Sequence, residues 1–245
     1  MLAIVGGSGL SQLSTLEGIR HAAVRTPYGE PSDPLAYGRI GGREVVFLAR
    51  HGAAHAIAPH QINYRANIWA LKQAGVDEIV SIATVGGIRR EFGPGALAVP
   101  DQILDYTWGR ASTFFEGAGQ KVTHIDFTEP YSARVRCRIL AAAAACGETV
   151  AAHAVYAATQ GPRLETAAEI ARLERDGADL VGMTGMPEAA LAREAGLDYA
   201  ALAVVANHAA GRGESAHAIS LERIEAVLAQ TMERVKRILV QLAAG

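Results

Sequence analysis

The sequence predicts an α/β fold in one domain, and three observations lead to this prediction. Hydrophobic residues make up half of the 245-residue chain and charged residues 20%, which is enough for a large core. After residue 40, short apolar runs typical of buried strands alternate with segments typical of helices. No repeat, low-complexity segment or linker divides the chain. We therefore expect a single domain over residues 1–245, built on a mainly parallel sheet.

The strand predictions rest on short runs of apolar and β-branched residues. In chain order they cover residues 2–5, 44–49, 78–83, 97–104, 149–159, 178–181 and 199–206. The last run consists of small and branched residues, which fits burial on both faces of a sheet.

The helix predictions rest on apolar residues at helical spacing and on end signals. They cover residues 63–74, 132–146, 166–176, 188–195 and 221 to about 242. Pro187 suits the first turn of the fourth helix, and Ser220 is a good N-cap for the last one. From residue 108 to 131 the chain is polar, aromatic and rich in Gly and Pro. We expect an irregular excursion there, which lines a pocket or reaches a neighbouring subunit.

Composition excludes several classes of protein. The net charge of −2 gives no sign of a nucleic-acid or membrane-surface partner. Cys137 and Cys146 fall in or beside one predicted helix, without clustered histidines, so we expect neither a disulfide framework nor a metal site. The first apolar run is four residues long and lacks a basic leader, and no run approaches the ~20 apolar residues of a membrane span. We expect a cytoplasmic protein.

Small hydroxyls, glycines and cationic side chains follow several predicted strands. Ser8 lies in the glycine turn after the first strand, and Arg50 and His51 follow the second. Thr84 and Thr184 follow two others. The glycine turn fits either a phosphate cradle or a plain tight turn, and the Arg–His pair fits either a phosphate grip or a surface pair. Because ligands collect at the carboxyl ends of parallel strands, these groups together could hold one dianion.

The anion predicted at this edge is free inorganic phosphate. Gln12 stands where a dinucleotide-binding turn would need glycine, and no lysine-bearing phosphate loop is present. The sequence also shows no acidic cluster that would hold the metal of a nucleoside triphosphate. Phosphate held by neutral donors and one cation stays able to attack a carbon that gains positive charge.

Five motifs, in the same order along nearly the whole chain, resemble those of the trimeric purine nucleoside phosphorylases, in particular the methylthioadenosine/methylthioinosine phosphorylase branch. The motifs are 6–9, 50–52, 63–72, 160–163 and 182–188. The resemblance implies a three-layer phosphorylase-like fold, with a central mixed and largely parallel sheet flanked by helices. It also implies a homotrimer with each active site near a subunit boundary. The implied reaction is phosphorolysis, in which phosphate attacks the ribosyl C1′ and the purine leaves, without a cofactor besides the phosphate co-substrate.

The resemblance further implies roles for individual residues. Implied phosphate ligands are Ser8, Arg50, His51, Thr84 and Thr184, with the backbone at Ala83 assisting. Implied nucleoside contacts are Met183 under the ribose, Leu164 where the family often has an aromatic ring against the base, and His124 of a neighbouring subunit with Leu221 around the 5′ group. His124 taken alone fits a surface or core-edge histidine equally well.

The departure from the family pattern lies at residues 207–209. Adenosine-type enzymes carry Asp-x-Asp there, whereas this chain has Asn207 and Ala209. An amide can donate to a 6-oxo oxygen and accept from a protonated N7, and it leaves a 6-amino group facing a donor. Such a site can reject the wrong base on the order of 10⁴-fold. We therefore expect a 6-oxopurine nucleoside as substrate, with methylthioinosine preferred over inosine.

The residues expected to act in catalysis are Asn207, Arg50 and His51. Phosphate held at Arg50 would stabilise the oxocarbenium-like ribosyl centre. Asn207 would stabilise negative charge on the leaving purine, a contribution of about 3 kcal/mol. His208 either relays a proton to N7 or faces solvent. The alternatives are a methylthioadenosine phosphorylase that tolerates Asn207, an inosine/guanosine phosphorylase, and a non-enzymatic nucleoside-binding protein, which would hold nucleoside equally well without phosphate.

Overall fold

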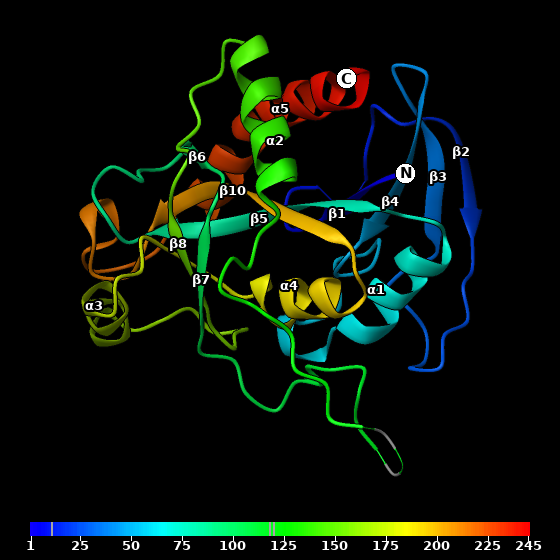
Figure 1. Ribbon diagram of the computed structural model, residues 1–245. Coiled ribbons are helices and arrows are strands. Elements are labelled where there is room, and N and C mark those ends of the chain that lie inside the picture. The colour runs from blue at the N-terminus through cyan, green and yellow to red at the C-terminus, as the bar shows by residue number, and fades with distance from the viewer. Residues whose placement is uncertain (11, 118, 120) are drawn as a thin grey trace.

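The computed structural model describes residues 1–10, 12–117, 119 and 121–245, and a ten-stranded sheet forms its centre (Figure 1). The strands are β1 Leu2–Gly6, β2 Glu17–Ala22, β3 Leu35–Ile40, β4 Arg43–Ala49, β5 Glu78–Gly87, β6 Leu97–Ala98, β7 Gln102–Asp105, β8 Val155–Ala158, β9 Leu180–Gly182 and β10 Asp198–His208. Their order is β2-β3-β4-β1-β5-β9-β8-β7, with β10 added on β5 and β6 on β10. The predicted α/β class is confirmed.

The sheet is mixed but its centre is parallel. β1 runs parallel to β4 and β5, and β5 runs parallel to β10. β7, β8 and β9 form a second parallel group, which joins the first through an antiparallel contact of β9 with the end of β5. The two groups therefore meet beside the last residues of β5.

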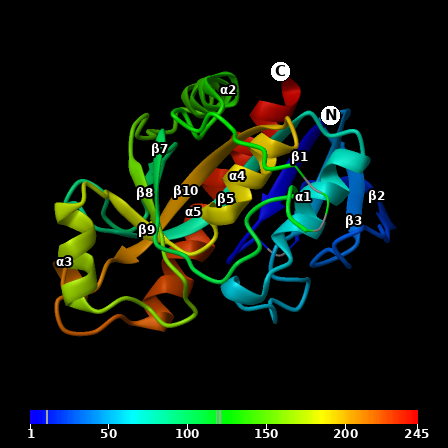
Figure 2. The ribbon, with the colours of Figure 1, turned by 60° about the horizontal axis from the view of Figure 1, so that its bottom comes forward.

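Helices cover both faces of the sheet and give three layers (Figures 1 and 2). The α-helices are α1 Tyr64–Gln73, α2 Ala133–Ala145, α3 Ala167–Arg175, α4 Gly185–Glu194 and α5 Leu221–Ala244, with short 3₁₀ turns at Pro59–Gln61 and Gly213–Ser215. α2 packs on α5 over one face, and α1 packs on α4 over the other. No helix within the described residues is long and apolar enough to cross a membrane.

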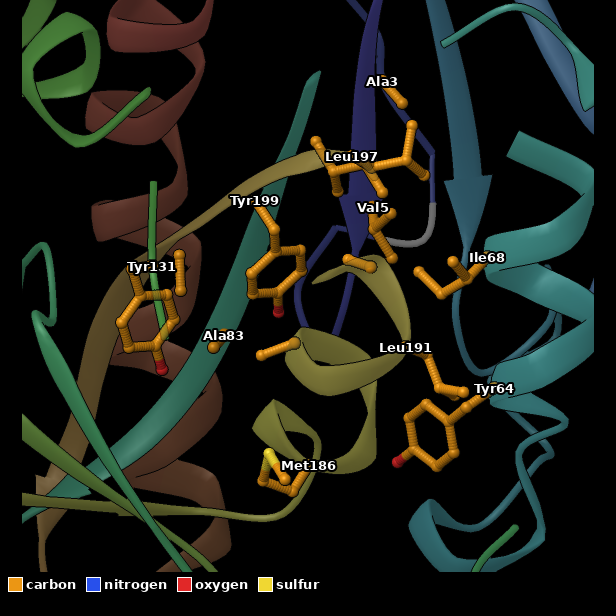
Figure 3. Close-up of a cluster of buried hydrophobic side chains, with 14 of the residues drawn as sticks. Ala3, Val5, Tyr64, Ile68, Ala83, Tyr131, Met186, Leu191, Leu197 and Tyr199 are labelled. Atoms are coloured by element: carbon orange, nitrogen blue, oxygen red, sulfur yellow. The ribbon is translucent and has the colours of Figure 1, made fainter. Parts of the chain in front are cut away.

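Side chains of the central strands alternate between two cores, as the period of two in a strand requires. Ala3 and Val5 point to the core under α1 and α4, part of which Figure 3 shows. Leu2 and Ile4 point to the core under α2 and α5. Burial on both faces explains why these strands read as continuous apolar runs.

Four of the five predicted helix starts are confirmed by their caps. Asn63, Ser132, Thr166 and Ser220 each accept a hydrogen bond from a backbone N–H of the first turn. At Thr166 the side chain of Glu169 bonds back to the cap, which completes a capping box.

The long strand predicted over residues 149–159 was wrong in extent. Regular pairing covers only β8, and Ala151 makes a single bridge to Ala98. The chain changes partner in between, because Ala151 bonds to β6 and the residue after it, and Ala154 bonds to Asp101 just before β7. The segment 149–159 is apolar because much of it is buried, and not because it forms one continuous strand.

The apolar stretch predicted over residues 97–104 is two short strands, β6 and β7. Pro100 lies between them and has no N–H for a sheet ladder, so pairing stops there. The edge strand β2 and its neighbour β3 were not predicted. Five of the six residues of β2 are exposed, and the strand therefore lacks the apolar signal.

The excursion predicted over residues 108–131 is irregular. Its described residues contain no helix or strand, and positions 118 and 120 lie outside the described part of the chain. Arg110 fastens its beginning to the rest of the protein, because the guanidinium donates to the carbonyls of Met183, Met186 and Gln160.

Candidate active site

A cavity of about 200 Å³ lies at the carboxyl ends of β1, β4, β9 and β10, beside the last residues of β5. It brings together nine of the residues predicted from sequence. They are Ser8, Arg50, His51, Thr84, Leu164, Met183, Thr184, Asn207 and Ala209. Residues from position 8 to position 209 thus converge at the sheet edge where ligands of α/β proteins collect.

Three predicted site residues do not line this cavity. Ala83 is buried and directly precedes Thr84 on β5, so only its backbone lies near the site. His124 is exposed within the irregular segment. Leu221 is 65% exposed at the first position of α5. The predicted roles of His124 and Leu221 toward a 5′ group remain predictions.

The apolar wall of the cavity comes instead from Ile219, Ile224 and Leu228. Ile224 and Leu228 are about one helical turn apart on α5 and face the same side, and Leu221 lies one turn before Ile224 on that face but does not line the cavity. Helical spacing alone did not indicate which of the apolar residues of α5 would face the cavity.

Arg50 lines the cavity but is bound from behind by a buried carboxylate. Its exposed fraction is 1%, and that of Glu188 on α4 is also 1%. The guanidinium donates Nε to Glu188 Oε2 at 2.6 Å and Nη2 to Oε1 at 2.9 Å. Burial would lower the pKa of Arg50, but the charge of Glu188 and its hydrogen bonds outweigh this effect and raise the pKa. Arg50 is therefore always charged, and its charge is compensated.

A guanidinium has five N–H donors, and four of those of Arg50 are occupied. Besides the two bonds to Glu188, Nη2 donates to Ser81 Oγ at 2.5 Å and Nη1 donates to the carbonyl of Ile82 at 3.2 Å. One N–H of Nη1 remains within the described contacts. It lies against Gly7, a cavity residue whose Cβ, if it had one, would be 2.9 Å from Nη1. Within the described contacts, Arg50 can therefore offer a ligand a single N–H, which does not allow a bidentate grip.

His51 is a neutral acceptor toward the cavity. Nδ1 lies 2.8 Å from the carbonyl oxygen of Ile57. A carbonyl only accepts, so Nδ1 carries the proton and Nε2 presents a lone pair. Burial, together with the nearby Arg50 and His55, lowers the pKa of His51 to about 4, although the contact with Ile57 opposes this shift. At neutral pH His51 therefore offers a ligand an acceptor and no donor.

The three hydroxyls around the cavity differ in their contacts. Thr84 Oγ1 donates to the carbonyl of Ser8 at 2.9 Å, which leaves its lone pairs facing outward. Ser8 Oγ lies 3.3 Å from His55 Nε2. Thr184 is the N-cap residue of α4, and its hydroxyl makes no bond to the backbone of that helix's first turn. Helical geometry in α4 is regular only from Pro187, because Met186 has extended φ and ψ angles of −119° and 140°.

A β-bulge places Asn207 in the cavity. The register of β10 against β5 shifts between Val205 and Asn207, so that Asn207 lies opposite Gly86. Such an extra residue re-aims the side chains that follow it. The amide nitrogen of Asn207 donates to the carbonyl of His208 at 2.6 Å. That bond fixes which way the amide faces, and it leaves one N–H and the oxygen for a ligand.

Glu165 is a cavity residue that the sequence reading missed. It is half-buried, and one carboxylate oxygen accepts from Thr159 Oγ1 at 2.6 Å. Burial raises the pKa of Glu165, while the bond from Thr159 lowers it. The available signal was its position next to Leu164, which had been placed against the base. Its carboxylate adds a hydrogen-bond acceptor to the cavity.

Met183 also lines the cavity and lies close to Gly161. A Cβ added to Gly161 would lie 2.4 Å from Met183 Sδ, and Gly161 has a φ of +62°. Only glycine fits there, because the position combines a left-handed backbone with a close approach. Among the described residues, no group of three or more His, Cys, Asp or Glu side chains is arranged to hold a metal ion.

Comparison with known proteins assigns the whole chain to one group. The family model described as the phosphorylase superfamily matches residues 1–244. A protein of Xanthomonas campestris named "Probable S-methyl-5'-thioinosine phosphorylase" is 58% identical, over 87% of this chain and 86% of its own length. A protein of the same name from Pseudomonas syringae is 54% identical over 99% and 98%. The 6-oxopurine nucleoside phosphorylase of Pyrococcus furiosus is 46% identical over 86% and 80%.

A solved structure supports the same assignment. Methylthioadenosine phosphorylase from Schistosoma mansoni, in complex with adenine, superposes with a TM-score of 0.92 at 33% sequence identity. The superposition covers 99% of this chain and 90% of that one.

Proposed function

Because the chain belongs to the phosphorylase superfamily, we propose that it converts S-methyl-5′-thioinosine and phosphate into hypoxanthine and 5-methylthioribose 1-phosphate. It is an enzyme of the pentosyltransferase type. The observation that carries the choice of substrate is the pair of Glu165 and Asn207 on the same cavity.

The base end of the cavity complements a 6-oxopurine. Hypoxanthine presents an N1–H group, and the free oxygen of Glu165 can accept a hydrogen bond from it. Its 6-oxo oxygen can accept the remaining N–H of Asn207, and a protonated N7 can donate to the amide oxygen. Adenine would direct the N1 lone pair at a carboxylate and a 6-amino group at an amide N–H. Unpaired and repulsive polar contacts of this kind give strong discrimination between substrates.

The opposite end suits a phosphate that still carries a proton. At neutral pH inorganic phosphate keeps at least one P–OH, and this group can donate to Nε2 of His51. The single free N–H of Arg50 and the hydroxyls of Ser8 and Thr184 supply donors to the other oxygens, whereas Thr84 Oγ1 donates to the carbonyl of Ser8 and can only accept from a ligand. Neutral donors hold the anion in place without a large excess of positive charge, so its oxygen remains a nucleophile.

The reaction then follows from these positions. A phosphate oxygen forms the bond to C1′ while the C1′–N9 bond breaks, and its electron pair moves into the purine ring. Asn207 stabilises this charge through O6 and N7, and Met183 supports the ribose. The apolar wall of Ile219, Ile224 and Leu228 favours a 5′-methylthio group over a 5′-hydroxyl.

We further propose that phosphate is the only co-substrate, and that the protein works in the cytoplasm as a homotrimer. In that assembly His124 and Leu221 would complete a neighbour's 5′ pocket. Both side chains are exposed in one chain and neither lines its own cavity, which suits such a role.

The test is phosphorolysis of methylthioinosine, methylthioadenosine, inosine and adenosine in parallel, with and without phosphate. We expect the highest kcat/KM for methylthioinosine and no turnover in phosphate-free buffer. Preference for methylthioadenosine would refute the base assignment, and equal rates for inosine would refute the 5′ assignment. Nucleoside binding that needs no phosphate and leads to no cleavage would favour the non-enzymatic alternative.

A further inference from the structure

A buried carboxylate, Glu188, lies behind the phosphate end of the cavity and does not line it. It accepts four hydrogen bonds: Nε and Nη2 of Arg50, Ser81 Oγ at 2.9 Å and the hydroxyl of Tyr199 at 2.8 Å. The proposed function gives this group no role.

The four bonds fix the position of Glu188 in all directions. Two parallel N–H···O bonds hold the carboxylate in the plane of the guanidinium. Ser81 on β5 and Tyr199 on β10 bind the same oxygen, Oε1, and prevent the carboxylate from rotating. Figure 3 shows the Tyr199 hydroxyl directed toward α4, the helix that carries Glu188. The guanidinium is therefore held from the side opposite the cavity.

We propose that Glu188 is the positioning residue for phosphate in this enzyme, an inference that rests on the proposed phosphate-dependent reaction. Glu188 occupies Nε and one N–H of Nη2, and with Ser81 and Ile82 it leaves one N–H of Nη1, an atom that lies beside Gly7 of the cavity. Which atom of Arg50 meets phosphate is thus decided by Glu188.

Glu188 also sets the charge that phosphate meets. The Arg50–Glu188 pair is neutral overall, so the anion encounters an oriented N–H dipole and not an isolated cation. Stability alone does not require this arrangement, because a buried ion pair contributes little compared with well-packed apolar residues of similar size. The location of the pair next to the cavity is explained if its function is to orient the Arg50 N–H that binds phosphate.

The discriminating variant is Glu188→Asp, which keeps the charge and moves it back by one methylene. Because the guanidinium follows the carboxylate, the free N–H withdraws from the phosphate position. We expect the KM for phosphate to rise about 10- to 100-fold, the value of one charge-assisted hydrogen bond. The KM for nucleoside should change less than about threefold, because no nucleoside contact involves this pair.

The matched control is Glu78→Asp. Glu78 is also buried, with a side-chain exposure of 4%, and is paired with arginines 43, 134 and 138, but it lies away from the cavity. This variant should lose thermal stability and keep the wild-type KM for phosphate. A purely structural role for Glu188 would make the two variants behave alike, and that result would overturn the proposal.

A second variant decides the question if Glu188→Asp does not fold. Arg50→Met combined with Glu188→Leu removes the pair and leaves no buried charge, an exchange that cores often tolerate. The folded double variant should bind nucleoside but lose the thermal shift that phosphate gives the wild type. An unchanged phosphate shift would overturn the proposal.

Calorimetric titration with inorganic phosphate separates this inference from the proposed function. Wild-type protein that binds phosphate but cleaves no nucleoside would refute the proposed function. In that case the phosphate affinities of the wild type and of Glu188→Asp would still test the inference. Wild-type protein that binds no phosphate would refute both. Normal cleavage with unchanged phosphate affinity in Glu188→Asp would refute the inference alone.

Discussion

Replacing Glu165 with glutamine tests the base assignment most directly. The side chain keeps its size and can still accept from Thr159, but the carboxylate that faces the base becomes an amide. An amide can donate to the N1 lone pair of adenine and is a weaker acceptor for the N1–H of hypoxanthine. The substitution therefore changes the preferred base without emptying the cavity.

The magnitude follows from the contact that is lost. A hydrogen bond to a half-buried carboxylate contributes about 1.5–3 kcal/mol, against roughly 0.5–1.5 kcal/mol for a neutral bond. The difference of about 1–2 kcal/mol corresponds to a loss of roughly 5- to 30-fold in kcat/KM for methylthioinosine. Methylthioadenosine should improve, because a repulsive contact becomes a hydrogen bond. The ratio of the two substrates should shift by about 100-fold.

The assay measures initial rates for both nucleosides at saturating phosphate, with hypoxanthine or adenine as the detected product. Thr159→Val is the matched control, because it removes the hydroxyl that orients Glu165 and keeps the carboxylate. It should reduce turnover of methylthioinosine only a few-fold. If Glu165→Gln leaves the ratio of the two substrates at its wild-type value, Glu165 does not read the base.

Three further predictions concern the other groups of the cavity. Asn207→Asp should shift preference toward 6-amino bases by roughly tenfold, measured as the ratio of kcat/KM values, and an unchanged ratio would contradict the amide argument. Arg50→Ala leaves Glu188 buried without its cation and should lower the free energy of unfolding by about 3–5 kcal/mol in guanidinium titrations; a loss below about 1 kcal/mol would argue against the pair. The pKa of His51 falls from 6.5 to about 4 on folding. Between pH 6.5 and pH 4 the unfolded chain therefore binds a proton at His51 that the folded protein does not bind. The free energy of unfolding consequently decreases as the pH falls from about 6.5 toward 4. His51→Gln should flatten the melting temperature over that range, and an equal slope in both proteins would exclude His51 as its source.

Much of the site could be predicted because its residues follow strands. Ser8, Arg50, Thr84 and Thr184 each come after an apolar run, and parallel strands bring their carboxyl ends to one edge. The alternation of strands and helices was sufficient to predict both the fold class and this convergence. Capping residues likewise marked where the helices begin.

The features of the site that could not be predicted from the sequence depend on contacts that no local pattern reveals. No local pattern shows that Glu188 occupies two N–H groups of Arg50, since the two residues are 138 positions apart. The acceptor role of His51 depends on a carbonyl six residues away in an irregular loop. The bulge before Asn207 follows from its pairing with β5, which the sequence of β10 alone does not reveal.

The distance along the chain between Arg50 and Glu188 has a consequence for biosynthesis. Contacts that close such long loops form late in folding, because closure costs chain entropy before it is rewarded. A nascent chain that has released β1, β4 and β5 from the ribosome still lacks the carboxylate on α4, so its arginine can adopt many orientations. Phosphate affinity therefore appears only when the last third of the polypeptide has been added and docked. Protection by phosphate against a protease would report the yield of fully folded molecules during refolding or translation.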